Sequence, residues 1–211
     1  MPRRLKRAII NYMTLYKNIY RVKSTRHPDW NYADDGMYFI TICTKDKQEF
    51  FGKINKEEMF LNNIGKISNK IWLEIPKYFS NVILDEYIIM PNHVHGVISI
   101  CNDGRDAINR VPMGNGPVNG RDAINRVSTG GITGRHNPMG KESLGEIIRW
   151  YKGRCSFEIK KLLPNVNFAW QSRFYDHIIR NEKSLNKIRE YIANNPLKWS
   201  LDRNNPENLY M

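Results

Sequence analysis

Hydrophobic positions follow two different spacings along the chain, and the two together predict a mixed fold. Residues 37–44 and 82–90 are rich in β-branched and aromatic side chains, which is typical of strands. Between them, isoleucines recur at helical spacing over residues 63–79, so an amphipathic helix is expected there. A short hairpin is expected before that helix, with arms at residues 50–54 and 59–61.

The second half of the chain continues this mixture. Ser143 and Glu146 form a capping-box pattern that predicts a helix running to about residue 162. A strand is expected at residues 174–179 and a last helix at residues 184–195, where Pro196 stops it. We therefore predict an α+β fold, an antiparallel sheet with helices packed mainly on one face.

Composition changes along the chain suggest its domain organisation. Residues 1–36 are expected to be a basic arm, with a short helix over residues 8–20, and residues 201–211 a C-terminal tail. The domain itself is expected at 37–200. It is interrupted at 102–141 by a Gly-, Asn- and Pro-rich insertion, which contains one eight-residue sequence twice and is expected to be flexible.

The charge balance narrows the class of partner. The chain has 33 Lys and Arg against 21 Asp and Glu, a net charge of +12, which favours a polyanion such as nucleic acid. The alternative is a merely solubilising surface. Three widely spaced cysteines favour a reducing compartment, and no apolar run is long enough for a membrane span. We expect a cytoplasmic protein with no membrane partner.

The two histidines of the His93-Val-His95 sequence are the strongest candidates for chemistry. Side chains alternate along a strand, so His93 and His95 share one face, about 7 Å apart. Two imidazoles at that spacing could chelate one divalent ion, although such a pair could also be structural. The residues between and after them, such as Val94 and Ile98, face the other way and can enter a core.

Tyr191 and Asn195 lie four residues apart on the last expected helix, so they share one face, with Lys187 one turn earlier. Placed over the histidines, this helix would present a phenol and a carboxamide oxygen to the same ion. Tyrosine has a pKa of about 10 and needs a nearby cation or base to act as a nucleophile. The alternative is that Tyr191 is an ordinary residue at a helix edge.

Three motifs in this order resemble the single-tyrosine HUH transposases of bacterial insertion sequences, in the branch of REP-associated tyrosine transposases. They are Met90-Pro-Asn-His-Val-His-Gly96, Trp170 to Asn181, and Tyr191-Ile-Ala-Asn-Asn-Pro196. The resemblance covers about residues 37–200 outside the insertion. It implies a ferredoxin-like sandwich, a metal-dependent endonuclease activity and single-stranded DNA transposition at palindromic hairpins.

The same resemblance implies roles for individual residues. His93, His95 and Asn195 would bind Mg²⁺ or Mn²⁺, and Tyr191 would attack the DNA to give a covalent 5′-phosphotyrosine. The resemblance is compatible with either a monomer or a homodimer for this protein. Tyr175 and Tyr151 are rival nucleophiles, and His177 is expected to order its strand or touch DNA.

Basic and aromatic residues near these motifs are expected to bind DNA, the cations through phosphates and the aromatics by stacking on unpaired bases. They are Arg149, Trp150, Lys152, Arg154, Trp170, Arg173, Phe174 and Lys187.

Core packing is the alternative for the aromatic residues, and for Trp170 above all. Two other functions stay open. One is a non-cleaving protein that binds DNA hairpins. The other is a metal-dependent hydrolase that uses water in place of the tyrosine.

Overall fold

The computed structural model describes residues 30–102, 140–202, 204–206 and 208, together with two short strands near the N-terminus. Those two, β1 (Leu15–Tyr16) and β2 (Ile19–Tyr20), pair with each other, so the helix expected over residues 8–20 is wrong at these positions. The rest of the arm expected at 1–36 and most of the insertion expected at 102–141 lie outside the described residues.

A four-stranded antiparallel sheet forms the centre of the molecule. Its strands are β3 (Gly36–Cys43), β6 (Val82–Ile89), β7 (His93–Ile100) and β8 (Tyr175–Ile179), in the order β6-β7-β3-β8. A separate hairpin, β4 (Gly52–Asn55) with β5 (Glu58–Leu61), follows the 3-10 turn η1 (Lys45–Lys47). In chain order the sheet and its first two helices read β-α-β-β-α-β, the ferredoxin-like arrangement.

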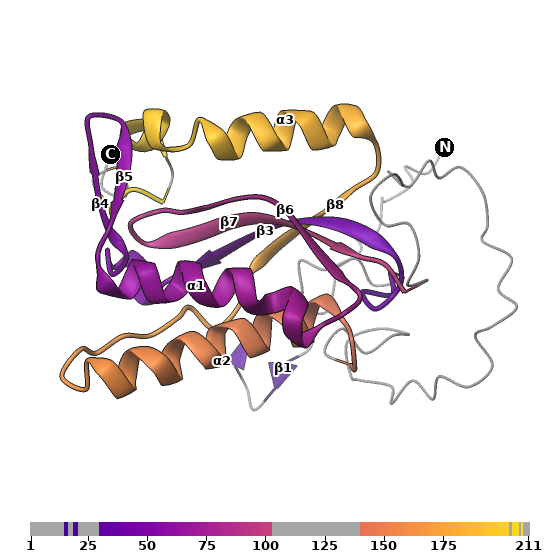
Figure 1. Cartoon of the computed structure of the whole chain (residues 1–211), viewed down its shortest axis with the longest axis horizontal. Helices are drawn as coiled ribbons and strands as arrows, with labels where there is room; N and C mark the ends of the chain where they lie inside the picture. The colour runs from indigo at the N-terminus through magenta and orange to yellow at the C-terminus, as the bar shows by residue number, and fades with distance from the viewer. Residues whose placement is uncertain are drawn as a thin grey trace, which may run out of the picture.

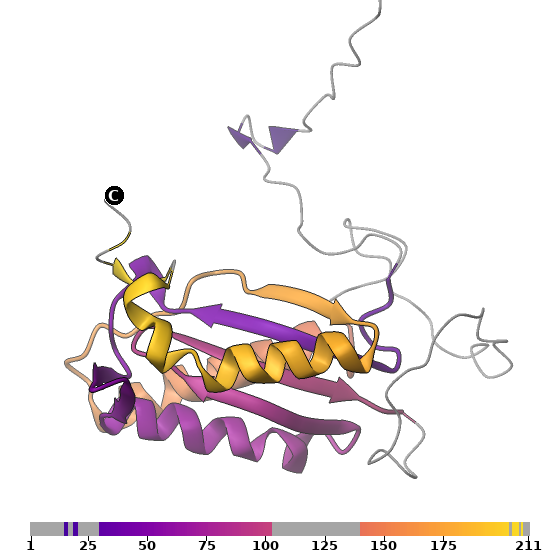
Figure 2. The same ribbon diagram turned by 90° about the horizontal axis from the view of Figure 1, so that it is seen from above.

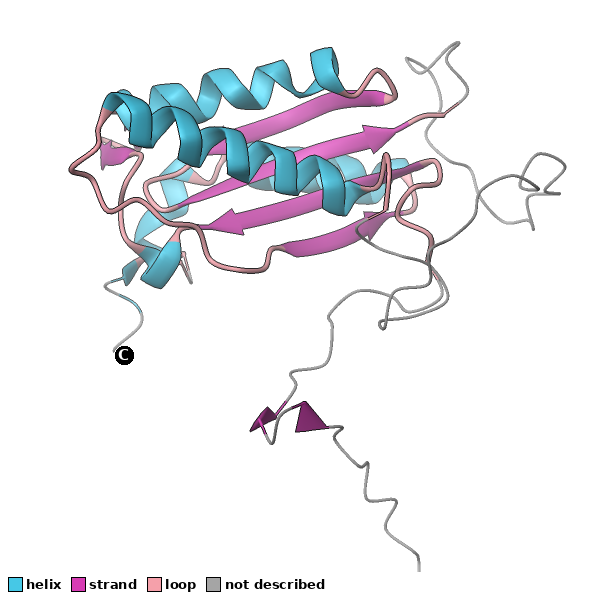
Figure 3. Cartoon of the chain, turned by 90° about the horizontal axis from the view of Figure 1, so that it is seen from below, coloured by secondary structure: helices cyan, strands magenta, loops and turns pink. Residues whose placement is uncertain are grey.

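Helices cover both faces of the sheet, two on one side and one on the other (Figure 1). The pair consists of α1 (Asn63–Tyr78) and α2 (Leu144–Leu162), and Figure 3 shows them side by side in front of the sheet. The single helix is α3 (Glu182–Ala193), followed by the 3-10 helix η3 (Pro196–Leu201). The predicted α+β sandwich, with helices mainly on one face, is confirmed.

Strand alternation separates two clusters of buried side chains. The larger cluster lies beneath α1 and α2 and includes Ile40, Ile98, Trp72 and Tyr151. The smaller lies beneath α3 and contains Met37, Val97, Ile179, Leu185 and Ile192. Because β7 contributes alternate residues to the two clusters, its histidines must face the side of α3.

The expected domain bounds of 37–200 remain a prediction. Residues just before and just after this range nevertheless pack against the rest of the domain. Tyr32 is buried, stacks on Tyr38 and accepts a backbone hydrogen bond from Leu144. At the other end, Asp202 and Asn204 are buried. Among the residues that the structure describes, no helix is both long and apolar enough to cross a membrane.

Candidate active site

His93 and His95 lie side by side at the start of β7, on the face covered by α3. Both side chains are buried, and their ring centroids are 4.4 Å apart. The Nδ1 atom of His95 is hydrogen-bonded to the Thr41 hydroxyl at 2.9 Å, and that of His93 to the Asn92 carboxamide oxygen at 2.8 Å. Such bonds fix the rings, so Nε2 is the nitrogen of each ring that could coordinate a cation.

Asn92 connects the histidine strand to the C-terminal segment. Besides holding His93, its Nδ2 donates to the backbone carbonyls of Lys47 at 2.9 Å and Asn204 at 2.7 Å. The Asn92 side chain is fully buried, and its bonds to His93 and to the Asn204 carbonyl form away from water. One residue of the turn before β7 therefore fixes both a histidine ring and the path of the chain beyond η3.

Gly96 follows His95 and has a steric role on the opposite face of β7. A Cβ atom built there would lie 2.4 Å from the indole of Trp72, well inside contact distance. The fully buried Trp72 lies against the strand at this point and stacks on Tyr87. The glycine thus allows an indole from α1 to pack directly behind His95, which keeps the strand in place.

Helix α3 brings Tyr191 to the histidines. The Tyr191 hydroxyl lies 3.3 Å from Nε2 of His95, and its side chain is 41% exposed. Asn181 caps the start of the helix, and Leu185 and Ile192 bury its apolar stripe.

A bidentate pair between Arg189 and Asp85 of β6 fixes the position of α3 on the sheet. This guanidinium holds the pKa of the Asp85 carboxyl below its usual value, and the carboxylate in turn raises the pKa of Arg189. The pair joins the helix that carries the phenol to the strand beside the histidines.

Asn195 lies just beyond α3, which ends at Ala193, two residues before the predicted end. Pro196 instead opens η3, because a proline is tolerated at the first position of a helix. Asn195 remains buried, and its Oδ1 has no hydrogen-bond partner among the described residues. A buried carboxamide oxygen without a donor is costly unless a ligand satisfies it.

Asp202 completes the site and was not predicted. The turn of η3 brings its carboxylate to the histidines, and ligand atoms of His93, His95 and Asp202 all lie within 4.8 Å of one another. Oδ2 of Asp202 accepts a hydrogen bond from Asn195 Nδ2 at 3.4 Å, and Oδ1 accepts from the Asn204 backbone at 2.6 Å. No periodicity marks this residue, and we expected it in a tail.

The donor atoms gathered here fit a divalent cation. Two imidazole nitrogens and one carboxylate form a mixed nitrogen and oxygen set, and the Nδ2 of Asn195 is hydrogen-bonded to that carboxylate. Carboxylate and carbonyl oxygens suit Mg²⁺ and Mn²⁺, and imidazole suits transition metals. His93, His95 and Asp202 could therefore hold a divalent metal ion.

The two rival tyrosines lie in different places. Tyr151 is fully buried under the other face and hydrogen-bonded to the Ser68 hydroxyl at 2.5 Å, and burial raises its pKa well above the usual value. It is therefore poorly suited to attack a polymer substrate. Tyr175 is 43% exposed and pairs with Thr41, so it shares the face of His95, as does His177.

The residues expected to bind DNA are not all gathered around this site. Arg149, Trp150, Lys152 and Arg154 belong to α2, on the opposite face of the sheet. Lys152 is turned inward and donates to the carbonyls of Gln171 and Ser172, and burial lowers its pKa.

The remaining candidates differ in exposure. Trp170 donates to the Lys152 carbonyl and packs on the rings of Phe51 and Phe168, which favours the core-packing alternative. Phe174 is partly buried against the same core. Arg173 and Lys187 are exposed, and of these Lys187 lies on α3, one turn before Tyr191.

Comparisons with known proteins give a relative by sequence and similar solved structures. No family model matches the chain. The solved structure of a REP-associated tyrosine transposase bound to a REP hairpin is similar with a TM-score of 0.48 and 15% identity, covering 84% of this chain and 74% of that one. A protein of Haemophilus influenzae, described as uncharacterized, is 35% identical over 185 residues, which are 88% of this chain and 93% of that protein. The chain belongs to the same family as this Haemophilus influenzae protein.

Proposed function

We propose that this protein is a transposase that cleaves and rejoins single-stranded DNA at palindromic hairpins, through a covalent 5′-phosphotyrosine on Tyr191 and with the help of a divalent metal. One observation carries the proposal. The exposed phenol of Tyr191 lies 3.3 Å from Nε2 of His95. This histidine belongs to a buried cluster with His93 and Asp202. A tyrosine held beside a metal-binding cluster and open to solvent is suited to attack a bulky phosphodiester.

Four residues would hold the metal, which is Mg²⁺ or Mn²⁺ in this proposal. His93 and His95 would bind through Nε2, since Thr41 and Asn92 engage their Nδ1 atoms. Asp202 and the Asn195 carbonyl oxygen would supply oxygen ligands. A divalent cation bound here supplies Lewis-acid stabilisation of the negative charge that develops on the phosphate.

Tyr191 would act as the nucleophile. Its phenolic oxygen forms a bond to the phosphorus, and the bond from phosphorus to the 3′-oxygen breaks, so that the strand ends in a free 3′-hydroxyl. The phenolic proton passes to water, and the leaving oxygen takes up a proton. A 3′-hydroxyl from a second strand reverses these steps and rejoins DNA. Within one chain the Tyr191 hydroxyl already lies beside His95 of the cluster.

The cations would act at different distances from the reaction. Lys187 is exposed one turn before Tyr191 and would neutralise a phosphate next to the site. Arg149 and Arg154 lie on the far side of the sheet, so they would contact only DNA that extends beyond the site. Lys152 is the least suited of the set, because its ammonium group already binds backbone carbonyls.

The test is formation of a covalent adduct. The full-length protein is incubated with Mn²⁺ and a labelled DNA hairpin that carries a single-stranded flank, then denatured and resolved by electrophoresis. We expect a labelled protein band with the wild type, and none with Tyr191→Phe or after chelation with EDTA. Tyr175→Phe is the matched control, since it removes the other exposed hydroxyl on this face, and it should leave the band in place.

Other outcomes would identify the alternative functions. Hairpin binding that survives EDTA, without any adduct, would indicate a non-cleaving DNA-binding protein. Cleavage that releases a free 5′-phosphate and persists in Tyr191→Phe would indicate a hydrolase that activates water. An adduct that is lost only in Tyr175→Phe would move the nucleophile to β8.

A further inference from the structure

Helix α3 covers only part of its face of the sheet. It packs against β6, to which the pair of Arg189 and Asp85 fixes it, and β6 and β7 form one half of the sheet. Figure 2, viewed from the side of α3, shows β8 and much of β3 lying beside the helix rather than beneath it. On this half of the face Tyr175 and His177 of β8 are exposed beside α3, and we call the surface that they form with Phe39 and the flank of α3 the trough.

Three aromatic rings line the trough at the end near the candidate metal site. Phe39 of β3 lies between Tyr191 and Tyr175, with ring centroids 6.0 Å and 6.4 Å away, and both contacts are edge-on. Phe39 also stacks on the ring of His95 at 5.3 Å. Tyr175 and Tyr191 are 43% and 41% exposed. The rings form a continuous apolar surface from the histidines to the edge strand.

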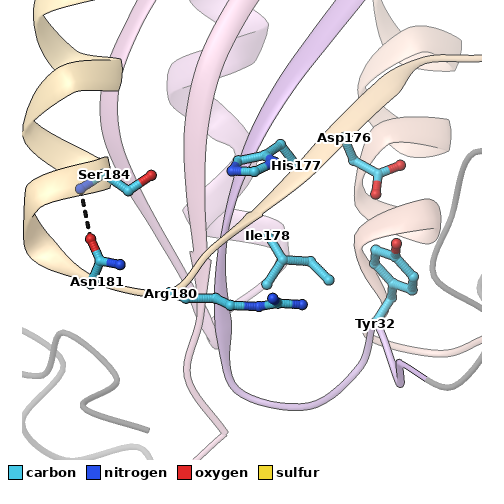
Figure 4. A pocket seen from close by; sticks show the side chains of 7 residues that line it. All are labelled: Tyr32, Asp176, His177, Ile178, Arg180, Asn181 and Ser184. Atoms are coloured by element: carbon cyan, nitrogen blue, oxygen red, sulfur yellow. Dashed lines mark hydrogen bonds between the residues drawn. The ribbon is translucent and has the colours of Figure 1, made fainter.

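Polar groups line the other end of the trough. Ser184 lies two turns before Tyr191 and on the same side of α3, about 10 Å along the helix axis. There a pocket of about 340 Å³ lies at the edge of β8. His177, Asn181 and Ser184 line it on the side of α3, and Tyr32, Asp176 and Ile178 line it on the other side of the strand, with Arg180 between them. Figure 4 shows the Arg180 side chain extended across this pocket, and the Asp176 carboxylate on the far side of β8 from His177. Lys187 lies on α3 between the two ends.

We propose that the trough binds the unpaired DNA segment that adjoins the scissile phosphate, with a base stacked on Tyr175 and the following phosphate held by Arg180 in the pocket. This inference rests on the proposed function and names the part of the substrate that the site receives. Exposed aromatic rings beside cations are the groups by which proteins bind single strands without base pairing. Bases inside a duplex are stacked on both faces and have no free face to offer Tyr175.

The test measures binding in EDTA, so that no cleavage contributes. Fluorescence anisotropy of the full-length protein is recorded with two probes, a labelled oligothymidine and a labelled blunt-ended DNA hairpin. Loss of one stacked base costs about 5- to 150-fold in affinity. We expect Tyr175→Ala to weaken oligothymidine binding within that range and to leave the blunt hairpin unchanged. Arg180→Gln should also weaken oligothymidine binding. Because one phosphate contact is lost, the affinity of this variant should fall less steeply than that of the wild type as the salt concentration rises.

Two control variants keep the test specific. Tyr175→Phe retains the ring and should bind oligothymidine as the wild type does. Phe157→Ala removes a side chain that is 59% exposed on α2, away from the trough, and should have no effect. Equal losses in Phe157→Ala and Tyr175→Ala, or no loss in Tyr175→Ala, would overturn the inference. A loss in Tyr175→Phe as large as that in Tyr175→Ala would overturn the stacking role.

Failure of this inference can be distinguished from failure of the proposed function. If Tyr191→Phe abolishes the covalent adduct while Tyr175→Ala binds oligothymidine normally, the proposed cleavage by Tyr191 is supported and the trough does not bind the single strand. If Tyr175→Ala loses oligothymidine binding but even the wild type forms no adduct, the trough binds single strands and the proposed cleavage is refuted.

Discussion

The two faces of the sheet differ in what they bury. Beneath α1 and α2 the buried groups are large and mostly apolar, such as Trp72 and Ile98. Beneath α3 the apolar cluster is small, and beside it lie His93, His95 and Asn195, all buried. Buried polar groups cost stability unless they are bonded or bind a ligand. The first face therefore stabilises the fold, and the second holds buried polar groups whose positions depend on that stability.

The strand β7 contributes residues to both faces, because its successive side chains point to opposite sides of the sheet. His95 lies beneath α3, while Val94 lies in the main core and Gly96 lies against Trp72. Substitutions one to three residues apart should therefore affect either stability or chemistry. The following predictions test that separation, in order of decreasing effect.

Ile98→Ala should produce the largest change in stability. Ile98 is fully buried in the main core, and truncation of such a side chain costs about 2–5 kcal/mol of unfolding free energy. Urea unfolding followed by circular dichroism measures the loss. The folded variant should still form the covalent adduct at the wild-type rate. A drop in adduct as complete as that in Tyr191→Phe would show that the two faces are not separable.

Thr41→Val should reduce metal affinity with little loss of stability. The Thr41 hydroxyl fixes the His95 ring, and loss of such a partner costs about 10- to 100-fold in metal affinity. Titration with Mn²⁺, followed by electron paramagnetic resonance, measures the change.

Ser68→Ala is the matched substitution on the other face. It weakens the hydrogen bonding of the buried Tyr151 hydroxyl and should cost up to about 1–3 kcal/mol of stability, with Mn²⁺ affinity unchanged. Equal Mn²⁺ affinities for Thr41→Val and the wild type would refute a role for Thr41 at the metal.

Asp85→Asn should have the smallest effect, at most about 1 kcal/mol, because the pair with Arg189 is partly exposed. Arg189 lowers the folded-state pKa of Asp85 below 3.8. The carboxylate therefore stabilises the fold above about pH 3.8, and this contribution is lost as the pH falls through the lowered pKa. Urea unfolding of both proteins at neutral and acidic pH measures it. A stability difference that grows on acidification would contradict the prediction.

Local sequence patterns predicted most of the fold. The helix expected at 63–79 is α1, and β8 begins one residue after its predicted start. The approach of Tyr191 to the histidines was implied by the family resemblance alone. Strand alternation predicted that His93 and His95 share a face, and helical spacing predicted that Tyr191 and Asn195 do. These features depend on neighbours within about one turn of helix or a few residues of strand, and such neighbours are visible in a sequence.

Features that depend on distant contacts were not predicted. Asp202 reaches the histidines only because η3 reverses the chain and Asn92 holds the carbonyl of Asn204. The helices α2 and α3 cover opposite faces of the sheet. The predicted DNA-binding residues of α2 therefore lie on the other face from Lys187 of α3. Hydrophobic periodicity says which side of an element is buried, but it does not say which other segment covers it.

The position of Asp202 in the chain has a consequence for truncation. Every strand and helix of the sheet precedes it. A chain shortened to end at Leu201 would keep both imidazoles and the phenol but would lose the carboxylate of the cluster. Under the proposed function, such a shortened chain should bind the metal more weakly although no element of the sandwich has been removed.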